Sequence, residues 1–333
     1  MTEVKNQAIY IDQDVPTGKE LDDRSSSGRR RPWGKHKMEN EYLSIAYQEV
    51  DARKAERLRL CAVFLHFLRR RETGEQKLEG AMFCHLRLCP ICSWRRSLKA
   101  QAQMMQVVQY LEQQDKRYHW IMLTLTTKNV SGDELSGQID LLMEAWKRLA
   151  QRKEVKAAMK GYYRALEITH NVNPLSPAYD TYHPHFHVLL AVNPSYFTSR
   201  DYISQKRWRQ LWQEAARLDY DPQVDVRRLK GLRPKDLVEL AKYTTKAADY
   251  IIPDDWELTI DTVRTLDAAL TRRRFLAFGG IIADARRKLA LDDAEDGDLV
   301  HVEDKPKLDK DGDMHITYLW YSGYRQYYSI SEG

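Results

Sequence analysis

The stretch TYHPHFHVLLAV, Thr181–Val192, decides the fold because it combines two signatures of a β-strand. Its histidines occupy alternate positions, and its second half is entirely apolar. Successive side chains of a strand point to opposite faces, so His185 and His187 share one face while Phe186 and Val188 occupy the other. The stretch therefore predicts a core strand with two imidazoles a pleat apart, where both can reach one divalent ion.

The segment before it, YYRALEITH at 162–170, predicts a second strand that supplies a carboxylate to the same face. Glu167 lies between two apolar residues, and antiparallel pairing of the two strands would bring it beside the histidines. A His-His-Glu set suits Mg²⁺ or Mn²⁺ and leaves positions for water and substrate. His183 and His170 remain alternative ligands, each nearer a loop.

Predicted strands and helices alternate on both sides of these two strands. Strands are predicted at 120–127, 162–170, 185–192 and 222–229, and amphipathic helices at 132–151 and 199–217. The order β-α-β-β-α-β is the split βαβ arrangement, which gives one antiparallel sheet. We expect an α+β fold with helices on one face of the sheet and a site on the open face.

The rest of the chain divides by composition into four predicted regions. Residues 1–40 form a basic, flexible tail, and 41–116 form a helical zinc-binding region in which a helical pattern runs toward position 68. Residues 117–252 form the core with the strands. Residues 253–333 form a C-terminal extension with a helical stretch at 255–291, an acidic loop at 292–313 and an aromatic, strand-like end.

Composition bounds the class of protein. The chain has 333 residues, a net charge of +5, 43% apolar and 30% charged residues, which is typical of a globular protein. It lacks a spanning apolar run and a signal peptide, so we expect a cytoplasmic protein without a membrane partner. Basic clusters favour a surface that tracks phosphates, although a solvated basic face is the alternative. The candidate DNA contacts are Arg95, Arg96, Arg227, Arg228 and Lys230.

The four cysteines are too few for a disulfide scaffold at this length. Three of them crowd into CHLRLCPIC at 84–92, a spacing typical of tetrahedral Zn²⁺ sites. The predicted ligands are the four thiolates Cys61, Cys84, Cys89 and Cys92. His85 and His66 are alternatives for the fourth position, and reduced, buried cysteines are the alternative to metal binding.

The stretch DLVELAKYTTKAADY at 236–250 predicts a helix, 234–248, with one apolar stripe. Glu239, Tyr243, Lys246 and Tyr250 fall together on the opposite side, at spacings of four, three and four residues. A tyrosine beside a lysine is a potential nucleophile because a nearby cation stabilises the phenolate. An ordinary surface patch is the alternative.

Together, HPHFHVLL and ELAKYTTKAADY resemble the HUH endonucleases, in which two histidines flank a hydrophobic residue and a tyrosine cuts one DNA strand. With WIMLTLTTKNV, YRALEITHN and FCHLRLCPICSWRRSLK, the chain more closely resembles the rolling-circle plasmid replication initiators, the Rep class with one catalytic tyrosine and a nearby glutamate. The resemblance covers roughly 61–250.

The resemblance implies roles for individual residues. His185 and His187 would be the metal pair, with Glu167 as third ligand. Tyr243 would attack a phosphodiester at the origin, leaving a 5′-phosphotyrosine and a free 3′-OH, with Lys246 positioning the phosphate. Glu239 would activate water to end the round. A two-tyrosine mechanism that also uses Tyr250 ranks second.

It also implies partners and cofactors. Plasmid origin DNA, single-stranded or a hairpin at the nick site, would be the substrate, and a host helicase and polymerase would follow. A divalent cation, Mg²⁺ or Mn²⁺, would serve nicking, and zinc would be structural. The alternatives are a relaxase or single-tyrosine transposase with the same chemistry, and a non-catalytic, zinc-stapled DNA-binding regulator.

Overall fold

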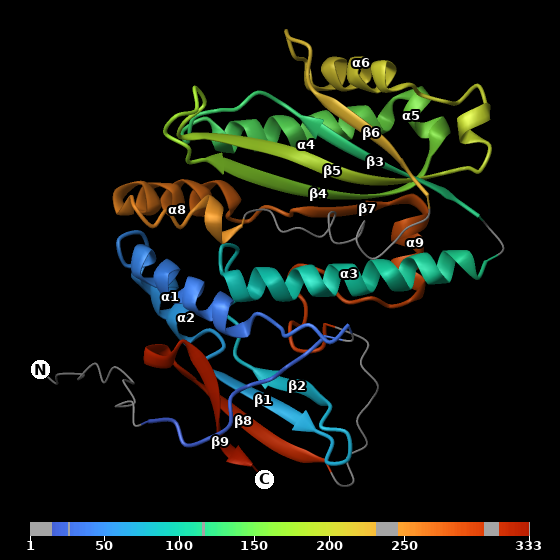
Figure 1. Cartoon of the computed structure of the whole chain (residues 1–333). Coiled ribbons are helices and arrows are strands. Elements are labelled where there is room, and N and C mark those ends of the chain that lie inside the picture. The colour runs from blue at the N-terminus through green and yellow to red at the C-terminus, as the bar shows by residue number, and fades with distance from the viewer. Residues whose placement is uncertain (1–14, 26, 115–116, 231–245, 303–312, 333) are drawn as a thin grey trace, which may run out of the picture.

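A computed structural model describes residues 15–25, 27–114, 117–230, 246–302 and 313–332 (Figure 1). Helices and antiparallel sheets alternate in these ranges, which confirms the predicted α+β class. The predicted helix at 234–248 falls largely outside the described residues, and its end, Ala247–Asp249, forms a 3₁₀ turn (η2). None of the helices within these ranges is both long and apolar enough to cross a membrane.

The larger sheet contains the strands predicted from the sequence. Within the described ranges its five strands lie in the order β6-β3-β5-β4-β7, and every pairing is antiparallel. Strand β5, Thr181–Val192, lies in the middle of this order, and its apolar half is buried on both faces. The others are β3 (His119–Thr126), β4 (Met159–Asn171), β6 (Val224–Leu229) and β7 (Leu276–Gly279).

Helices cover both faces of this sheet, so the expectation of helices on one face is wrong. On one face lie α4 (Leu135–Gln151), the short α5 (Lys153–Ala158) and α6 (Gln205–Ala216). On the other lie α3 (Pro90–Glu112) and α9 (Gly280–Lys288) (Figure 1). These two helices bury apolar side chains against β3, β4 and β5. These two helices cover only the apolar end of the strands, and the end with the histidines carries the site.

The segment 255–291 is not one helix. It forms α8 (Trp256–Leu270), then the edge strand β7, then α9. Gly280 occupies the second of the two breaks, between β7 and α9, where its backbone has φ of 56° and an added Cβ would collide with the carbonyl oxygen of Lys160. The glycine lets the chain turn sharply from β7 into α9 against the end of β4.

A second sheet joins the two ends of the chain. The predicted helical run from 41 to 68 is confirmed as far as position 60, where the chain forms α1 (Trp33–Gln48) and α2 (Ala52–Leu60). Beyond that it is wrong, because strands β1 (Phe64–Arg69) and β2 (Gln76–Ala81) follow. Strand β1 pairs with β8 (Met314–Tyr321), and β8 pairs with β9 (Gln326–Glu332). Part of the predicted C-terminal extension therefore shares a sheet with the zinc region.

The described part of the predicted tail is folded. Leu21 is 3% exposed and Trp33 is 1% exposed, and the backbone N–H of Leu21 donates to the carbonyl oxygen of Tyr327 in β9. The flexible-tail prediction therefore does not hold for residues 15–40. Residues 1–14 lie outside the described residues.

Candidate functional site

Strands β4 and β5 bring three predicted ligands together at one end of the larger sheet. Glu167 lies directly opposite His185 in the antiparallel register, as predicted. Its Oε2 is 2.9 Å from Nε2 of His187 and 3.6 Å from Nε2 of His185. The three ligand atoms lie within 4.8 Å of one another, and we call these residues the His-His-Glu cluster. This group can hold a metal ion.

Contacts at Nδ1 orient both imidazole rings so that Nε2 faces the Glu167 carboxylate. Nδ1 of His185 donates to the carbonyl oxygen of His183 over 3.0 Å, so Nε2 is the ring nitrogen that faces the carboxylate. Nδ1 of His187 lies 3.3 Å from the Thr124 hydroxyl on β3. Such outer contacts orient metal-ligating histidines. Sequence reasoning missed Thr124, whose only signal is its place opposite His187.

The carboxylate of the cluster is buried and charged. Burial alone would raise the pKa of Glu167, but hydrogen bonds from His185 and His187 outweigh it and hold the pKa well below its ordinary value. Nζ of Lys246 lies 3.5 Å from its other oxygen, Oε1, while the lysine side chain is half exposed. The cluster therefore combines an ionised carboxylate with a cation that reaches solvent.

The two alternative ligands lie outside the cluster. His183 stacks beside His185 with ring centroids 5.0 Å apart, and burial lowers its pKa. His170 points to the other face of the sheet, where its Nε2 lies 2.9 Å from Asp180 and its ring stacks on Tyr182. A surface hollow of about 430 Å³ adjoins the cluster on the His183 side. Its lining includes Asn129, Thr169, His170, Asn171, Asn173 and His183.

The four cysteines form a second buried cluster between α2, β2 and α3. Sγ of Cys61 is 3.7 Å from Sγ of Cys89 and of Cys92, and Cys84 is 3.7 Å from Cys92. Four thiolates around one Zn²⁺ at about 2.3 Å would be separated by about 3.8 Å. The spacing therefore fits a tetrahedral zinc site with Cys61 as the fourth member. His66 bonds instead to Thr317.

Local structure sets the cysteine spacing. Cys89 is the N-cap of α3 and Pro90 occupies the first turn, where proline is tolerated because its missing N–H has no intrahelical partner. The backbone N–H of Cys92 donates to Sγ of Cys89 over 3.5 Å. The C-P-I-C sequence thus forms a helix start that holds two thiols on one side.

Arg95 and Arg96 do not face solvent, which corrects their assignment to DNA contact. They are 4% and 0% exposed. Arg95 donates to the carbonyl oxygens of Leu299 and Val300, and Arg96 donates to those of Glu295, Leu86 and His85. Both guanidinium groups hold the segment 292–302 on α3, so part of the predicted acidic loop is packed structure. The rest of that loop, 303–312, lies outside the described residues.

Of the two predicted tyrosines, the structure describes Tyr250 and not Tyr243. Tyr250 is 1% exposed, its hydroxyl donates to the carbonyl oxygen of Leu88 over 2.6 Å, and burial raises its pKa well above the ordinary value. A phenol in this position cannot meet a substrate. Tyr243 and Glu239 lie outside the described residues.

The remaining predicted DNA contacts line an exposed edge. Arg227 and Arg228 belong to β6, which is the edge strand of the larger sheet within the described ranges, and Lys230 follows it; all three are exposed. Arg227 pairs with Asp225 at 2.9 Å, and the guanidinium of Arg228 lies over the ring of Phe197.

Residues 75–328 match the family described as "Replication protein". The chain is 38% identical to "Protein rep" of Bacillus amyloliquefaciens, with 92% of this chain and 96% of the relative covered. It is 43% identical to "Protein rep" of a Bacillus species, covering 82% and 91%, and 34% identical to "Protein rep" of Streptococcus pneumoniae, covering 93% and 96%. No solved structure matches the chain.

Proposed function

The chain belongs to the replication protein family, the rolling-circle plasmid replication initiators, and from this premise we propose that it nicks and rejoins one strand of its origin DNA. The reaction is metal-dependent and passes through a 5′-phosphotyrosine. The observation that carries the proposal is the His-His-Glu cluster, in which two Nε2 atoms and a carboxylate oxygen lie within 4.8 Å at one end of the sheet.

The ligand set suits the cation that this chemistry needs. Imidazole and carboxylate together accept Mg²⁺ or Mn²⁺ and leave positions for a phosphate oxygen. Such an ion, when bound, polarises the scissile phosphate. His185, His187 and Glu167 would hold it, and the half-exposed ammonium of Lys246, 3.5 Å from Glu167, would contact the phosphate.

Tyr243 is the proposed nucleophile. Tyr250, the rival, is buried against Leu88, which supports the single-tyrosine assignment. Tyr243 precedes Lys246 by three residues, and three residues of chain span at most about 11 Å. A nucleophile at position 243 is therefore within chain reach of the lysine beside the cluster.

The proposed chemistry is a balanced transesterification. The Tyr243 phenol oxygen attacks the phosphorus, the P–O3′ bond breaks, and the phenol proton is released as the 3′-oxygen leaves as a hydroxyl. The free 3′-OH primes synthesis by a host polymerase, with a host helicase opening the duplex. At the end of a round, Glu239 takes a proton from water, and the water oxygen attacks the next phosphodiester and breaks its P–O3′ bond. The freed 3′-OH then attacks the phosphotyrosine, the bond between phosphorus and the Tyr243 oxygen breaks, and the phenol regains a proton as the strand is joined.

A nicking assay on supercoiled plasmid tests the proposal. Purified protein with Mg²⁺ or Mn²⁺ is expected to convert a plasmid carrying the cognate origin to the open-circular form, with protein attached at the 5′ end. A plasmid lacking the origin and a reaction with chelator are the controls. A protein that binds the origin and never cuts it would instead support the non-catalytic regulator.

A further inference from the structure

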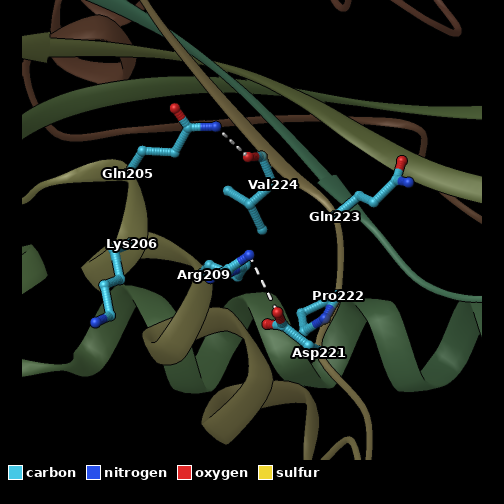
Figure 2. A pocket seen from close by; sticks show the side chains of 7 residues that line it. All are labelled: Gln205, Lys206, Arg209, Asp221, Pro222, Gln223 and Val224. Carbon is cyan, nitrogen blue, oxygen red and sulfur yellow. Dashed lines mark hydrogen bonds and ion pairs between the residues drawn. The ribbon is translucent and has the colours of Figure 1, made fainter.

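We propose that the hollow between α6 and β6 binds the phosphate backbone of the DNA that flanks the nick. Its lining comes from the start of α6 and from the loop into β6 (Figure 2). The residues are Gln205, Lys206, Arg209, Asp221, Pro222, Gln223 and Val224, around about 540 Å³ of open volume. We call this feature the α6–β6 hollow. The inference rests on the proposed nicking function.

Sheet register places the hollow at the same end of the sheet as the His-His-Glu cluster, but the hollow lies on the face that α6 covers and the histidines lie on the face that α3 and α9 cover. On β3, Thr124 lies opposite His187 of β5 on one side and opposite Asp225 of β6 on the other. Two strand spacings of about 4.8 Å separate β5 from β6, so the edge strand lies about 10 Å from β5, and DNA leaving the cluster would pass around this edge to reach the hollow. That distance is about three nucleotide steps of 3.4 Å along a duplex.

Charge at the hollow favours a polyanion. Lys206 is exposed, and within the described residues its ammonium has no hydrogen bond or ion pair. Arg209 is about two-fifths exposed and pairs with Asp221 at 3.1 Å. The exposed cations Arg227, Arg228 and Lys230 continue along the same edge strand. DNA passing β6 would meet these cations together with Asp221 and Asp225, and lysine and arginine contacts to phosphates supply such binding.

The hollow is held open by a fixed frame. Nε2 of Gln205 donates to the carbonyl oxygen of Val224 over 2.9 Å, which ties the first turn of α6 to β6 (Figure 2). Trp208 and Trp212, on the inner side of the same helix, are fully buried. Lys206 and Arg209 therefore project from a rigid helix, and their replacement leaves its buried face intact.

The salt dependence of origin binding tests the inference. The variants are Lys206→Gln, Arg209→Gln and the double variant, with Lys35→Gln as the control because Lys35 is an exposed lysine on α1. Each lost phosphate contact is expected to reduce the slope of log K against log salt by about 1, and the double variant by about 2. Asp221→Asn should tighten binding, because it removes a negative charge and frees Arg209.

Cleavage separates this inference from the function on which it rests. At saturating DNA the double variant should nick at the wild-type rate, since neither residue belongs to the His-His-Glu cluster. Unchanged affinity and slope in the double variant, with a wild type that nicks, would overturn the hollow as a DNA site and leave its cations to an acidic protein partner. A wild type that fails to nick would contradict the proposed function, while the slope would still report on the hollow.

Discussion

Tyr250 donates its hydroxyl to the carbonyl oxygen of Leu88 over 2.6 Å, and Leu88 directly precedes the zinc-cluster residue Cys89. Four residues before Tyr250, the ammonium of Lys246 lies 3.5 Å from Glu167. The zinc region and the His-His-Glu cluster are thus connected by one short piece of chain, Lys246 to Tyr250.

Replacing Tyr250 with Phe tests the structural role of this tyrosine. The variant loses one buried hydrogen bond, so its free energy of unfolding should fall by about 1 kcal/mol. Its urea midpoint should fall accordingly. It should still form the covalent DNA adduct at the wild-type level. Urea titration and a gel assay for the adduct measure the two effects, and loss of the adduct in a folded Tyr250→Phe protein would return Tyr250 to the mechanism.

Zinc content tests the cysteine cluster. Elemental analysis is expected to find about one zinc per chain, and Cys89→Ser should lower both the zinc content and the melting temperature because structural zinc contributes folding free energy. Ser93→Ala, at a nearby position that is not a thiol, is the control for local packing. A purified protein that is free of zinc yet equally stable would count against the site.

The His-His-Glu cluster predicts a separation of cutting from binding. His185→Ala and His187→Ala should each reduce nicking by at least about 100-fold, since loss of outer-shell partners alone costs 10–100-fold at metal sites. Origin affinity should change little, because phosphate contacts come from other side chains. His170→Ala, at a histidine outside the cluster, should retain nicking. If the double variant His185→Ala, His187→Ala, assayed with chelator, nicks as fast as the wild type, the cluster does not act through a metal ion.

Glu295 predicts a stability effect at a residue that belongs to neither cluster. Its buried carboxylate accepts from the backbone N–H groups of Phe275 and Leu276 and pairs with Arg87 at 2.8 Å. Glu295→Gln breaks a buried ion pair and should cost about 3 kcal/mol of unfolding free energy. Thermal or urea unfolding measures this. The exposed ion pair of Lys147 and Glu144 supplies a control, since Glu144→Gln should have almost no effect.

Features set by local periodicity could be predicted from the sequence. The alternation in β5 placed His185 and His187 on one face, and pairing of neighbouring strands placed Glu167 opposite His185. The clustering of Cys84, Cys89 and Cys92 followed from their close spacing in the sequence. In each case the information lies within a few residues or in adjacent strands.

Features set by distant partners could not be predicted. Arg95 and Arg96 donate to Leu299 and Glu295, which lie about two hundred residues later in the sequence. The local sequence around the two arginines therefore could not show that they are buried. Pairing of β1 with β8 likewise joins the two ends of the chain. The glycine pair at 279–280 was a local signal that could have ended the predicted helix at 255–291.

Identification of the tyrosine that carries DNA is the most direct test of the central claim. Protein is incubated with Mn²⁺ and a single-stranded origin oligonucleotide, the covalent product is digested with trypsin and nuclease, and the modified peptide is sequenced by mass spectrometry. The account predicts a nucleotide on Tyr243, and no adduct with Tyr243→Phe. A nucleotide on Tyr250, or nicking that leaves no tyrosine adduct, would contradict it.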